Sequence, residues 1–378
     1  LYKINPFCIR EYKMKDIYIS KDKKSSDDFD VVYLDDTAPL PPLDEPPQEP
    51  QFEPEQPERP QKVKKAKKRR KHRFLRFVAA FIAVIIVLTS SFIYLFAAVS
   101  GYNKENLEAN QYISSSELTS SSMVTNILLM GVDGSSKTSQ RSDSMILVSI
   151  DMAHRKIKLT SFLRDSWVTI PSKDKMAKLN AAYSYGGAQL AVDTLEYNFG
   201  VDIDHFAAVD FDMFTQIIDK LGGVDVEVTE KEAKFINRTT RYTVESGESV
   251  HLDGAKALVY CRIRKLDTDY MRTYRQRKVI TALINKAKRT PLTKLIAIMR
   301  DIFPLITTDL SPLEITGLAY KGGMSMLLFD IEQTRVPLED QCDAGMHNGQ
   351  WTEVLDFDAV RRYLHDFIYT DKIDVSDK

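Results

Sequence analysis

NILLMGVDGSSKTSQRSDSMILVSID, residues 126–151, joins two apolar runs through a loop rich in glycine and serine. From Gly131 to Thr138 the loop nearly matches the P-loop pattern G-x-x-x-x-G-K-[ST], with Ser136 in place of the second glycine. A P-loop opens directly into a helix whose N-terminus holds the phosphates. Here the loop leads into Met145–Ile150, a β-prone apolar run with the length of a buried strand. The stretch therefore predicts strand, loop and strand, and the likeness to a P-loop is attributed to chance.

Apolar runs of strand length and segments of helical periodicity alternate beyond this stretch. Helical periodicity occurs at 188–199, at 211–221 before two glycines, and at 360–367 behind a capping Asp356. The first three strands follow one another without helices, so we predict an α/β fold with a central mixed β-sheet flanked by helices. Residues 123–371 would form this single domain, with a C-terminal tail at 372–378. Strands are expected at Asn126–Met130, Met145–Ile150, Ile157–Phe162, Phe206–Asp210 and Val224–Val228.

Residues 77–99 carry no charged side chain and at helical rise span roughly 35 Å, enough to cross a hydrocarbon core of about 30 Å. We therefore predict one transmembrane helix there. A signal peptide would lie nearer the N-terminus and end in small residues at a cleavage site. The basic run KVKKAKKRRKHRFLR at 62–76 precedes the helix, which places the N-terminus in the cytoplasm and the domain outside.

The segments on either side of this helix are polar. Residues 1–76 form an acidic and proline-rich, then basic, cytoplasmic tail that is expected to be largely disordered. Residues 100–122 would form an extracellular stalk. The basic run could instead bind nucleic acid, but next to a membrane helix it faces anionic headgroups, so no nucleic-acid partner is expected. The formal net charge of −1 averages these regions and excludes no partner.

Three cysteines are distributed across the predicted membrane. Cys8 would be cytoplasmic, while Cys261 and Cys342 would be outside and could pair if their Cα atoms approached within about 7 Å. Two unpaired thiols are preferred over a disulfide, and a nucleophilic cysteine is not expected. No spacing of histidine and cysteine indicates zinc.

Arginines are concentrated in CRIRKLDTDYMRTYRQ, residues 261–276. Arg262 and Arg264 share a face if the segment is extended. Asp269 could cap a helix that follows it. On that helix Arg272, Arg275 and Gln276 would share one face at positions i, i+3 and i+4. Guanidinium groups converging from two elements suit a polyanion because each donates bidentately to phosphate oxygens. The alternative is an ordinary solvated helix with salt bridges.

Acidic residues follow or precede the predicted strands. Asp133 ends the first strand, Asp143 begins the second, and the doublet Arg164-Asp165 follows the third. If these strands are adjacent, all lie at one edge of the sheet. Strand ends and turns commonly carry aspartate, which is the alternative explanation. Combined with the arginines, these carboxylates favour metal-assisted chemistry on a pyrophosphate outside a membrane.

The chain resembles the LytR-CpsA-Psr (LCP) family of cell-wall glycopolymer ligases. The matching segments follow the family's order, and a short cytoplasmic tail with one membrane helix is also typical of it. The segment D-x-x-R-x-x-R-Q together with RSD is quite specific. The segments are NILLMGVD at 126–133, RSDSMILVSID at 141–151, KLTSFLRD at 158–165, KLNAAYSYGG at 178–187, DKLGGVDVEV at 219–228 and CRIRKLDTDYMRTYRQ at 261–276.

The resemblance implies a single-pass membrane enzyme of a Gram-positive-type envelope. It would transfer an anionic glycopolymer, such as teichoic acid or capsule, from a polyprenyl-pyrophosphate carrier to peptidoglycan through a phosphodiester. Asp133 and Asp143 would hold Mg²⁺ or Mn²⁺, and Asp165 would orient Arg164 or assist deprotonation of the acceptor hydroxyl. The resemblance further implies a catalytic set of Arg164, Asp165, Arg262, Arg264, Arg272 and Arg275, and a substrate-binding set of Arg141, Asn180 and Gln276.

The chain departs from the family at two positions, and other functions would use the same groups. The chain has Ser135 where the family often has an arginine, and Leu163 where it has a proline. A polyprenyl-pyrophosphate pyrophosphatase would use the same groups with water as the nucleophile. A non-catalytic lipid-pyrophosphate scaffold and, less favoured, a membrane-bound transcriptional regulator are further alternatives. Family members also enclose the prenyl chain in an apolar tunnel, whose lining cannot be told from core by sequence.

Overall fold

The structure is a computed structural model that describes residues 103–133, 140–311, 313–315, 317, 328–347 and 349–373. The chain divides into units 1–66 and 67–378, and every described residue belongs to the second unit. The expected cytoplasmic tail, the transmembrane helix at 77–99, residues 134–138 of the P-loop-like stretch and, among them, Ser135 lie outside the described residues. Within the described ranges, no helix has the length and apolar character needed to cross a membrane.

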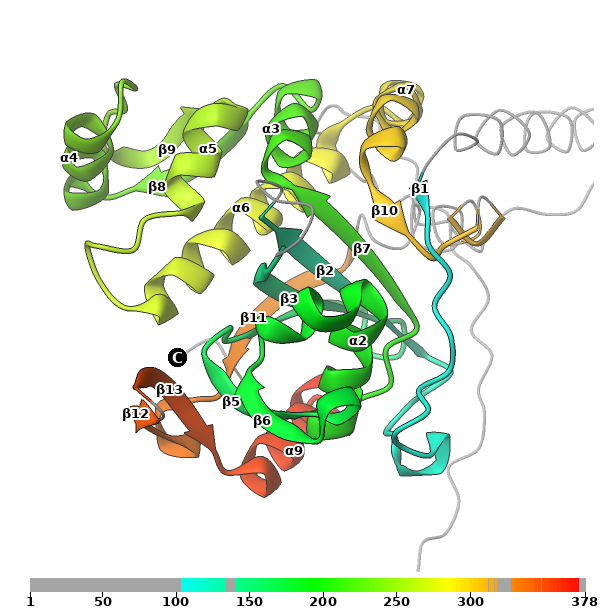
Figure 1. Ribbon diagram of the computed structural model, residues 1–378. Coiled ribbons are helices and arrows are strands. Elements are labelled where there is room, and N and C mark those ends of the chain that lie inside the picture. Colours follow the sequence, from blue (N-terminus) through cyan, green and yellow to red (C-terminus); the bar gives the residue numbers. More distant parts are fainter. Residues whose placement is uncertain are drawn as a thin grey trace, which may run out of the picture. The chain divides into compact units, whose positions relative to one another are not determined.

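A seven-stranded mixed sheet forms the centre of the described domain (Figure 1). Strand β2 pairs antiparallel with β3, and β3 pairs antiparallel with β4. Strand β7 is parallel to β2, and β11 is parallel to β4. The predicted mixed sheet is thus confirmed. The five expected strand segments are confirmed as well, although the fifth, Val224–Val228, lies in a separate hairpin. In sheet order the strands are β1 (Asn103–Lys104), β10 (Thr307–Thr308), β7 (His205–Asp210), β2 (Val124–Val132), β3 (Ser142–Asp151), β4 (Lys156–Phe162) and β11 (Asp330–Val336).

Both faces of this sheet are covered by helices (Figure 1). Because side chains alternate along a strand, Leu128 and Met130 of β2 pack on the side of α2 (Ala181–Phe199) and α9 (Phe357–His365). Their neighbour Leu129 packs with Ile280 of α6 (Asp269–Arg289) on the other side. Strand β3 is buried almost throughout, as expected for a strand between two helical layers.

Caps and glycines fix where the helices begin and end. Asp356 caps α9 through a bond from the Ala359 N–H, and Asp210 caps α3 (Phe211–Lys220) through Met213. Gly222 and Gly223 adopt φ values of 78° and 75°, which lets the chain reverse after α3. Further helices are α4 (Glu230–Thr239), α5 (Gly254–Cys261) and α7 (Leu292–Ile302), and short helical turns occur at Ser115–Glu117, Pro171–Lys173, Phe303–Leu305, Glu339–Gln341 and Asp366–Thr370.

Two smaller sheets extend the central one. One is the hairpin of β8 (Val224–Val228) and β9 (Gly247–Leu252), which shares a separate apolar cluster with residues of α3, α4, α5 and α6. The other has the strand order β12-β13-β5-β6. Its members are β12 (Cys342–His347), β13 (Gln350–Leu355), β5 (Ser166–Ile170) and β6 (Lys175–Lys178).

This topology places the predicted site residues at one edge of the central sheet. Strands β2 and β4 both run antiparallel to β3, so the ends of β2 and β4 lie beside the start of β3. Asp133 follows β2, Asp143 is the second residue of β3, and Arg164-Asp165 links β4 to β5. Cys261 and Cys342 are both free thiols, as the sequence predicted.

Candidate functional site

Asp143 lies at the centre of a group of arginines. One carboxylate oxygen accepts a bond from Arg164 Nη1 at 3.0 Å, and the other accepts from Arg264 Nη2 at 2.7 Å. Its backbone carbonyl accepts from Arg272 Nη2 at 3.3 Å. Burial acts to raise the pKa of Asp143, but the three arginines outweigh it and hold that pKa below its usual value. Asp143 is therefore ionised at neutral pH.

Arg272 is the most enclosed of these arginines, with 1% of its surface exposed. It pairs with Asp269 at 2.8 Å, yet its Nε and Nη1 atoms are buried without a hydrogen-bond partner, as is Nε of Arg164. Burial lowers the pKa of Arg272 to about 10, so it stays charged at neutral pH. Buried donors without acceptors are rare because they cost free energy. An anion with several oxygen atoms would supply the missing acceptors.

Two further carboxylates border the arginines. Asp165 accepts from Lys178 at 2.7 Å and lies 3.4 Å from Nε of Arg164. Asp269 lies 3.7 Å from Arg164 Nη2 and, as noted, pairs with Arg272. Burial raises the pKa of Asp269, and the neighbouring arginines offset only part of that effect. Asp269 was considered only as a cap, and Lys178 only as part of a matching segment, so sequence reasoning missed both as members of the site.

Asp133 and Asp143 lie at the same end of the β2–β3 pair. The Asp133 N–H donates to the Arg141 carbonyl at 3.0 Å, and Val132 is in register with Ser142. In the part of the chain that the structure describes, no group of three or more acidic, histidine or cysteine side chains is arranged for a metal. Mg²⁺ commonly uses only one or two protein carboxylates and takes its other ligands from phosphates and water. The donor set therefore fits a metal ion shared with a bound phosphate.

Arg275 is separated from the other predicted arginines. Its Nε donates to Glu232 of α4 at 2.6 Å, and its two Nη atoms donate to Asp267. Arg275 is 1% exposed, so these carboxylates neutralise it within the protein. Positions i and i+3 of a helix are neighbours, but a long side chain at one of them can turn to a different partner. Arg272, Arg275 and Gln276 thus share one helix as expected, but the Arg275 guanidinium binds Glu232 and Asp267 and not the group around Asp143.

Two other predicted residues lie where the arginine group meets an apolar cavity. The Arg262 guanidinium lies 4.3 Å above the ring of Phe211 and is exposed. The side-chain oxygen of Gln276 accepts from Ser144 at 3.0 Å. Both Arg262 and Gln276 line the cavity.

The remaining predicted contacts are peripheral to Asp143. Arg141 is exposed at the start of the path into β3. Asn180 precedes α2, is 5% exposed, and donates its N–H to the Arg164 carbonyl at 3.2 Å. This bond joins the beginning of α2 to the turn that carries Arg164, and it leaves the role of the Asn180 side chain a prediction.

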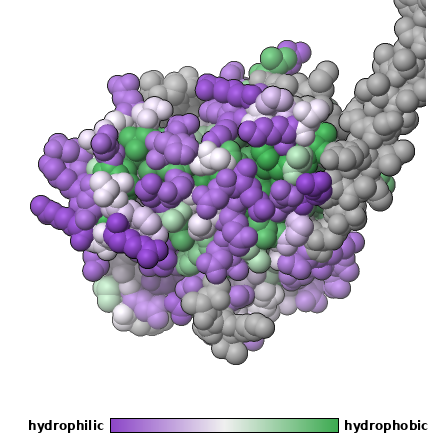
Figure 2. All heavy atoms as spheres, turned by 90° about the horizontal axis from the view of Figure 1, so that it is seen from above, coloured by the Kyte–Doolittle hydropathy of each residue, from purple (hydrophilic) through white to green (hydrophobic). Residues whose placement is uncertain are grey.

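The apolar cavity has a volume of about 250 Å³ and lies between the sheet and the helices α3, α5 and α6. Sequence alone could not separate its lining from ordinary core, because the same apolar residue types build both. In Figure 2, which looks down on the molecule from the upper side of Figure 1, apolar side chains gather in the middle of the face and polar ones surround them. The cavity lining includes Leu129, Ile146, Ala207, Phe214, Leu258 and Ile280.

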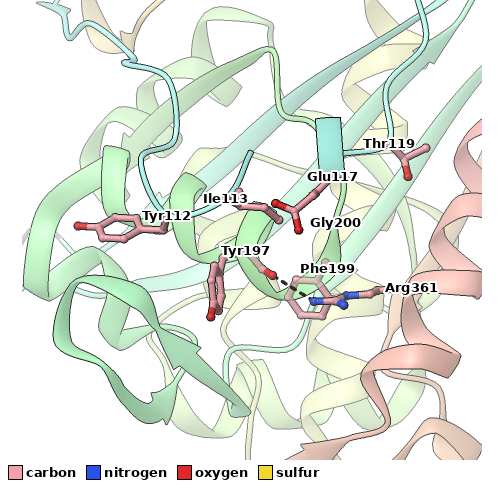
Figure 3. A pocket seen from close by; sticks show the side chains of 8 residues that line it. All are labelled: Tyr112, Ile113, Glu117, Thr119, Tyr197, Phe199, Gly200 and Arg361. Carbon is pink, nitrogen blue, oxygen red and sulfur yellow. Dashed lines mark hydrogen bonds between the residues drawn. The ribbon is translucent and has the colours of Figure 1, made fainter. Parts of the chain in front are cut away.

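A separate hollow of about 440 Å³ lies at the far end of α2 (Figure 3). Tyr112, Glu117 and Tyr197 line it, and Arg361 donates to the Tyr197 carbonyl at 3.1 Å. None of the predicted site residues lines this hollow. The arginine group and the apolar cavity beside it are therefore the better candidate for chemistry.

Comparison with known proteins identifies the family of this chain. A model of the LytR_cpsA_psr family matches residues 91–361. The chain is 37% identical over 188 residues to a polyisoprenyl-teichoic acid--peptidoglycan teichoic acid transferase, TagU of Halalkalibacterium halodurans, covering 49% of this chain and 60% of that protein. It is 36% identical over 197 residues to TagV of Bacillus subtilis, a transferase of the same name, covering 50% of this chain and 49% of that protein. The chain thus spans roughly half of the length of these curated relatives.

Solved structures share the fold over most of their length. The structure described as TagT bound to LIIa-WTA has a TM-score of 0.58 and 25% identity, and the match covers 70% of this chain and 99% of that one. The crystal structure of B. subtilis TagV has a TM-score of 0.54 and 29% identity, covering 66% of this chain and 98% of that one.

Proposed function

The chain belongs to the LytR-CpsA-Psr family, and from this premise we propose that it is a membrane-anchored phosphotransferase. It transfers an anionic glycopolymer from a polyprenyl-pyrophosphate carrier to peptidoglycan and forms a phosphodiester bond. One observation carries the proposal: Arg272, although buried, keeps two donor atoms without partners beside the arginines that hold Asp143. The teichoic acid transferase names of the relatives support the same activity.

The donor would bind with its two halves in two environments. The pyrophosphate accepts from Arg164, Arg264 and Arg272, and the prenyl chain enters the apolar cavity that begins at Arg262 and Gln276. Lipid in that cavity replaces water against apolar side chains, which favours binding in proportion to the area covered. The relatives TagU and TagV are named as polyisoprenyl-teichoic acid transferases, which supports a polyisoprenyl-linked substrate of this kind.

Arginines that now neutralise carboxylates would rearrange when the donor binds. Asp143 accepts from two guanidinium groups, and phosphate oxygens compete for the same donors. Once released, Asp143 and Asp133 are the residues that would hold Mg²⁺ or Mn²⁺ against the phosphate. The metal would add positive charge to the pyrophosphate oxygens.

In the reaction, the acceptor hydroxyl oxygen attacks the phosphorus that carries the glycopolymer. A new P–O bond forms, the bond to the bridging oxygen breaks, and polyprenyl phosphate leaves with the bonding electron pair. The proton of the hydroxyl passes to Asp269, whose pKa is raised, whereas the pKa of Asp143 is lowered. Asp165 orients Arg164, and the guanidinium groups stabilise the charge on the transferred phosphoryl and the leaving phosphate.

The test is transfer by the full chain in detergent, with a lipid-linked glycopolymer as donor and peptidoglycan oligomers as acceptor. Asp143→Ala and Arg272→Lys should each lower the transfer rate by about 100-fold or more, because the first removes a proposed metal ligand and the second removes guanidinium donors to the reacting phosphates. Arg300→Lys, at an exposed position on α7, is the matched control and should keep the wild-type rate. Thermal unfolding checks that each variant is folded.

The outcomes separate the proposed transferase from its alternatives. Product joined to peptidoglycan supports the transferase. Free polymer phosphate without joined product means that water is the nucleophile and the protein is a pyrophosphatase. Donor binding without any bond cleavage identifies a scaffold. An unchanged rate in Asp143→Ala would overturn the metal assignment.

A further inference from the structure

Arg277 is a buried cation on α6 that the proposed reaction does not use. It is 5% exposed and points toward β4 and β11, where Nη1 donates to Ser161 Oγ at 2.8 Å and Nε to Gln333 Oε1 at 3.3 Å. Both partners are neutral. Over the described ranges of the chain, Arg277 forms no ion pair, whereas Arg272 and Arg275, which are also buried on the same helix, each have carboxylate partners.

A buried guanidinium without an acidic partner is costly because its charge has lost water and gained no counter-charge. Burial lowers the pKa of Arg277 to about 10, and the nearby Arg335 acts in the same direction. At neutral pH the side chain still carries its charge. Groups whose pKa is shifted by burial in this way cluster at binding and catalytic sites, and an anionic ligand would supply the missing counter-charge.

Arg277 and Arg335 line a pocket of about 430 Å³, together with Gln333 and Thr334. The Arg335 guanidinium lies 3.8 Å above the ring of Tyr270 and donates to the Pro337 carbonyl at 2.9 Å. Its remaining ion pair, with Glu339 at 3.4 Å, is weak because the Glu339 side chain is 80% exposed. Arg335 can therefore turn to a ligand in the pocket.

The pocket is near the arginine group, but the two lie on different sides of α6. Arg277 follows Arg272 by five positions, which is roughly 7.5 Å along the helix axis and roughly 140° around it. Tyr270, which Arg335 covers, directly follows Asp269, and Ser161 precedes Arg164 by three residues. A substrate at the arginine group that extends past the beginning of α6 would reach the pocket.

The direction of the proposed reaction indicates which substrate extends this way. In-line displacement brings the nucleophile from the side opposite the leaving group. The leaving polyprenyl phosphate belongs to the cavity beside α3 and α5, so the acceptor enters from the other side of α6, where Tyr270 and Arg335 lie.

Charge in the pocket also favours the acceptor. Arg277 and Arg335 contribute positive charge inside, while Glu339 and Asp340 are exposed lining residues. A polymer of repeating phosphates would be repelled by the two acidic residues. A short peptide with both a carboxylate and an ammonium group, as in the peptide side chains of peptidoglycan, matches both signs.

We propose that Arg277 and Arg335 form an acceptor subsite that binds a carboxylate of the peptidoglycan peptide while the sugar hydroxyl faces the reacting phosphorus. This inference rests on the proposed function for the identity of the acceptor. Arg277 and Arg335 are positioning residues, because they hold the acceptor and do not touch the reacting atoms.

The test uses the full chain in detergent and a soluble disaccharide-peptide from peptidoglycan, in its acid form and with its carboxylates converted to amides. Calorimetry should show about tenfold weaker binding of the amide form to the wild type. Arg277→Gln and Arg335→Gln should bind both forms equally weakly. Arg300→Gln, which removes an exposed arginine elsewhere, should keep the preference for the acid. In transfer assays the acceptor KM should rise about tenfold in both variants, with kcat and the donor KM near the wild-type values.

Other results would overturn the inference. Equal binding of the acid and amide forms by the wild type removes the subsite even if transfer proceeds. A rise in the donor KM alone assigns the pocket to a phosphate of the glycopolymer instead. If Arg277→Gln does not fold, Arg335→Gln decides, since Arg335 is less buried. Acid-selective binding without any transfer would keep the subsite and reject the proposed function.

Discussion

Asp143 and Asp269 face the same arginines, yet their pKa values shift in opposite directions. Burial acts to raise both, but at Asp143 the bonds from Arg164 and Arg264 prevail, while at Asp269 burial prevails. Two carboxylates separated in this way suit two roles, one as a permanent anion and one as a proton acceptor. The environment of each side chain decides this assignment, so it could not be read from the residue types.

The raised pKa of Asp269 predicts a pH dependence of transfer. A proton acceptor works only when ionised, so kcat/KM should fall as pH decreases through the pKa of Asp269, which lies above the ordinary 3.8. Asp143, whose pKa is lowered, should not contribute in that range. The pH profile of kcat/KM should show this acidic limb, and Asp269→Asn should lose about 100-fold or more in rate together with the limb. An acidic limb that survives in Asp269→Asn would assign the proton to another group.

Among the elements, α6 is joined to α4 through Arg275. This arginine joins α6 to Glu232 of α4, which is 4% exposed, and to Asp267 of the preceding loop. The spacing of Arg275 from Arg272 suggested that both bind phosphate. Spacing along a helix shows which residues share a face, but it does not show which neighbour a side chain reaches. Of the two carboxylates that pair with Arg275, Glu232 lies on α4, which other elements separate from α6 in the chain, and Asp267 lies in the loop before α6.

This placement predicts that Arg275 acts on stability. Arg275→Ala should lower the free energy of unfolding by about 3–5 kcal/mol, because it leaves Glu232 buried without its counter-charge. The double variant Arg275→Met with Glu232→Gln should recover much of the loss, since no charge then remains buried. Thermal or urea unfolding measures both. Lost transfer with unchanged stability in Arg275→Ala would return the residue to the phosphate site.

A second junction between elements is held by Glu196 of α2. Asn110 Nδ2 donates to one oxygen of this carboxyl at 2.9 Å, and the Ile203 N–H donates to the other at 3.0 Å. Burial raises the pKa of Glu196 from 4.5 to about 7, and the nearby Asp202 and Asp193 act in the same direction. The bond from Asn110 ties the segment before β2 to α2.

The raised pKa predicts that the junction is stronger in mild acid. Because the folded-state pKa exceeds the unfolded value, the contribution of Glu196 is fully present below about pH 4.5 and is lost as pH rises through about 7. The full difference is about 3 kcal/mol at most. Glu196→Gln should unfold at a higher temperature than the wild type at pH 8 and show a smaller difference at pH 5. Parallel pH dependences of the wild type and the variant would contradict this origin.

Predictability of the elements followed their hydrophobic pattern. β2, β3, β4, β7 and β8 were expected because each buries apolar side chains in a run or in alternation. β11 (DIEQTRV) and β12 (CDAGMH) lack such a pattern, and their pairing is set by the neighbours β4 and β13. The same limit applies to Lys178 and Asp269, whose partners in the site lie on other segments.

In the described domain as a whole, the two faces of the central sheet are packed differently. The face toward α2 and α9 is filled by a continuous apolar core, while the face toward α3, α5 and α6 leaves a cavity of about 250 Å³. Hydrophobic periodicity sufficed to predict the sheet, and the charged residues at the ends of its strands indicated the edge where they meet. Neither pattern could locate the cavity, because a cavity is a property of how helices and sheet are spaced and not of any segment.

The cavity gives the prediction that tests the whole arrangement. Ala207 of β7 lines the cavity, so Ala207→Phe should fill part of it and raise the donor KM about tenfold or more while the arginine group is unchanged. Ala344→Phe, at an exposed position on β12, is the matched control and should leave the donor KM unchanged. A polyprenyl phosphate at 100 times its Kd should stabilise the wild type by about 2.7 kcal/mol and Ala207→Phe by much less, measured as a shift in Tm. Equal stabilisation of both would mean that the prenyl chain binds elsewhere, and the transfer chemistry would then need another way to hold its lipid.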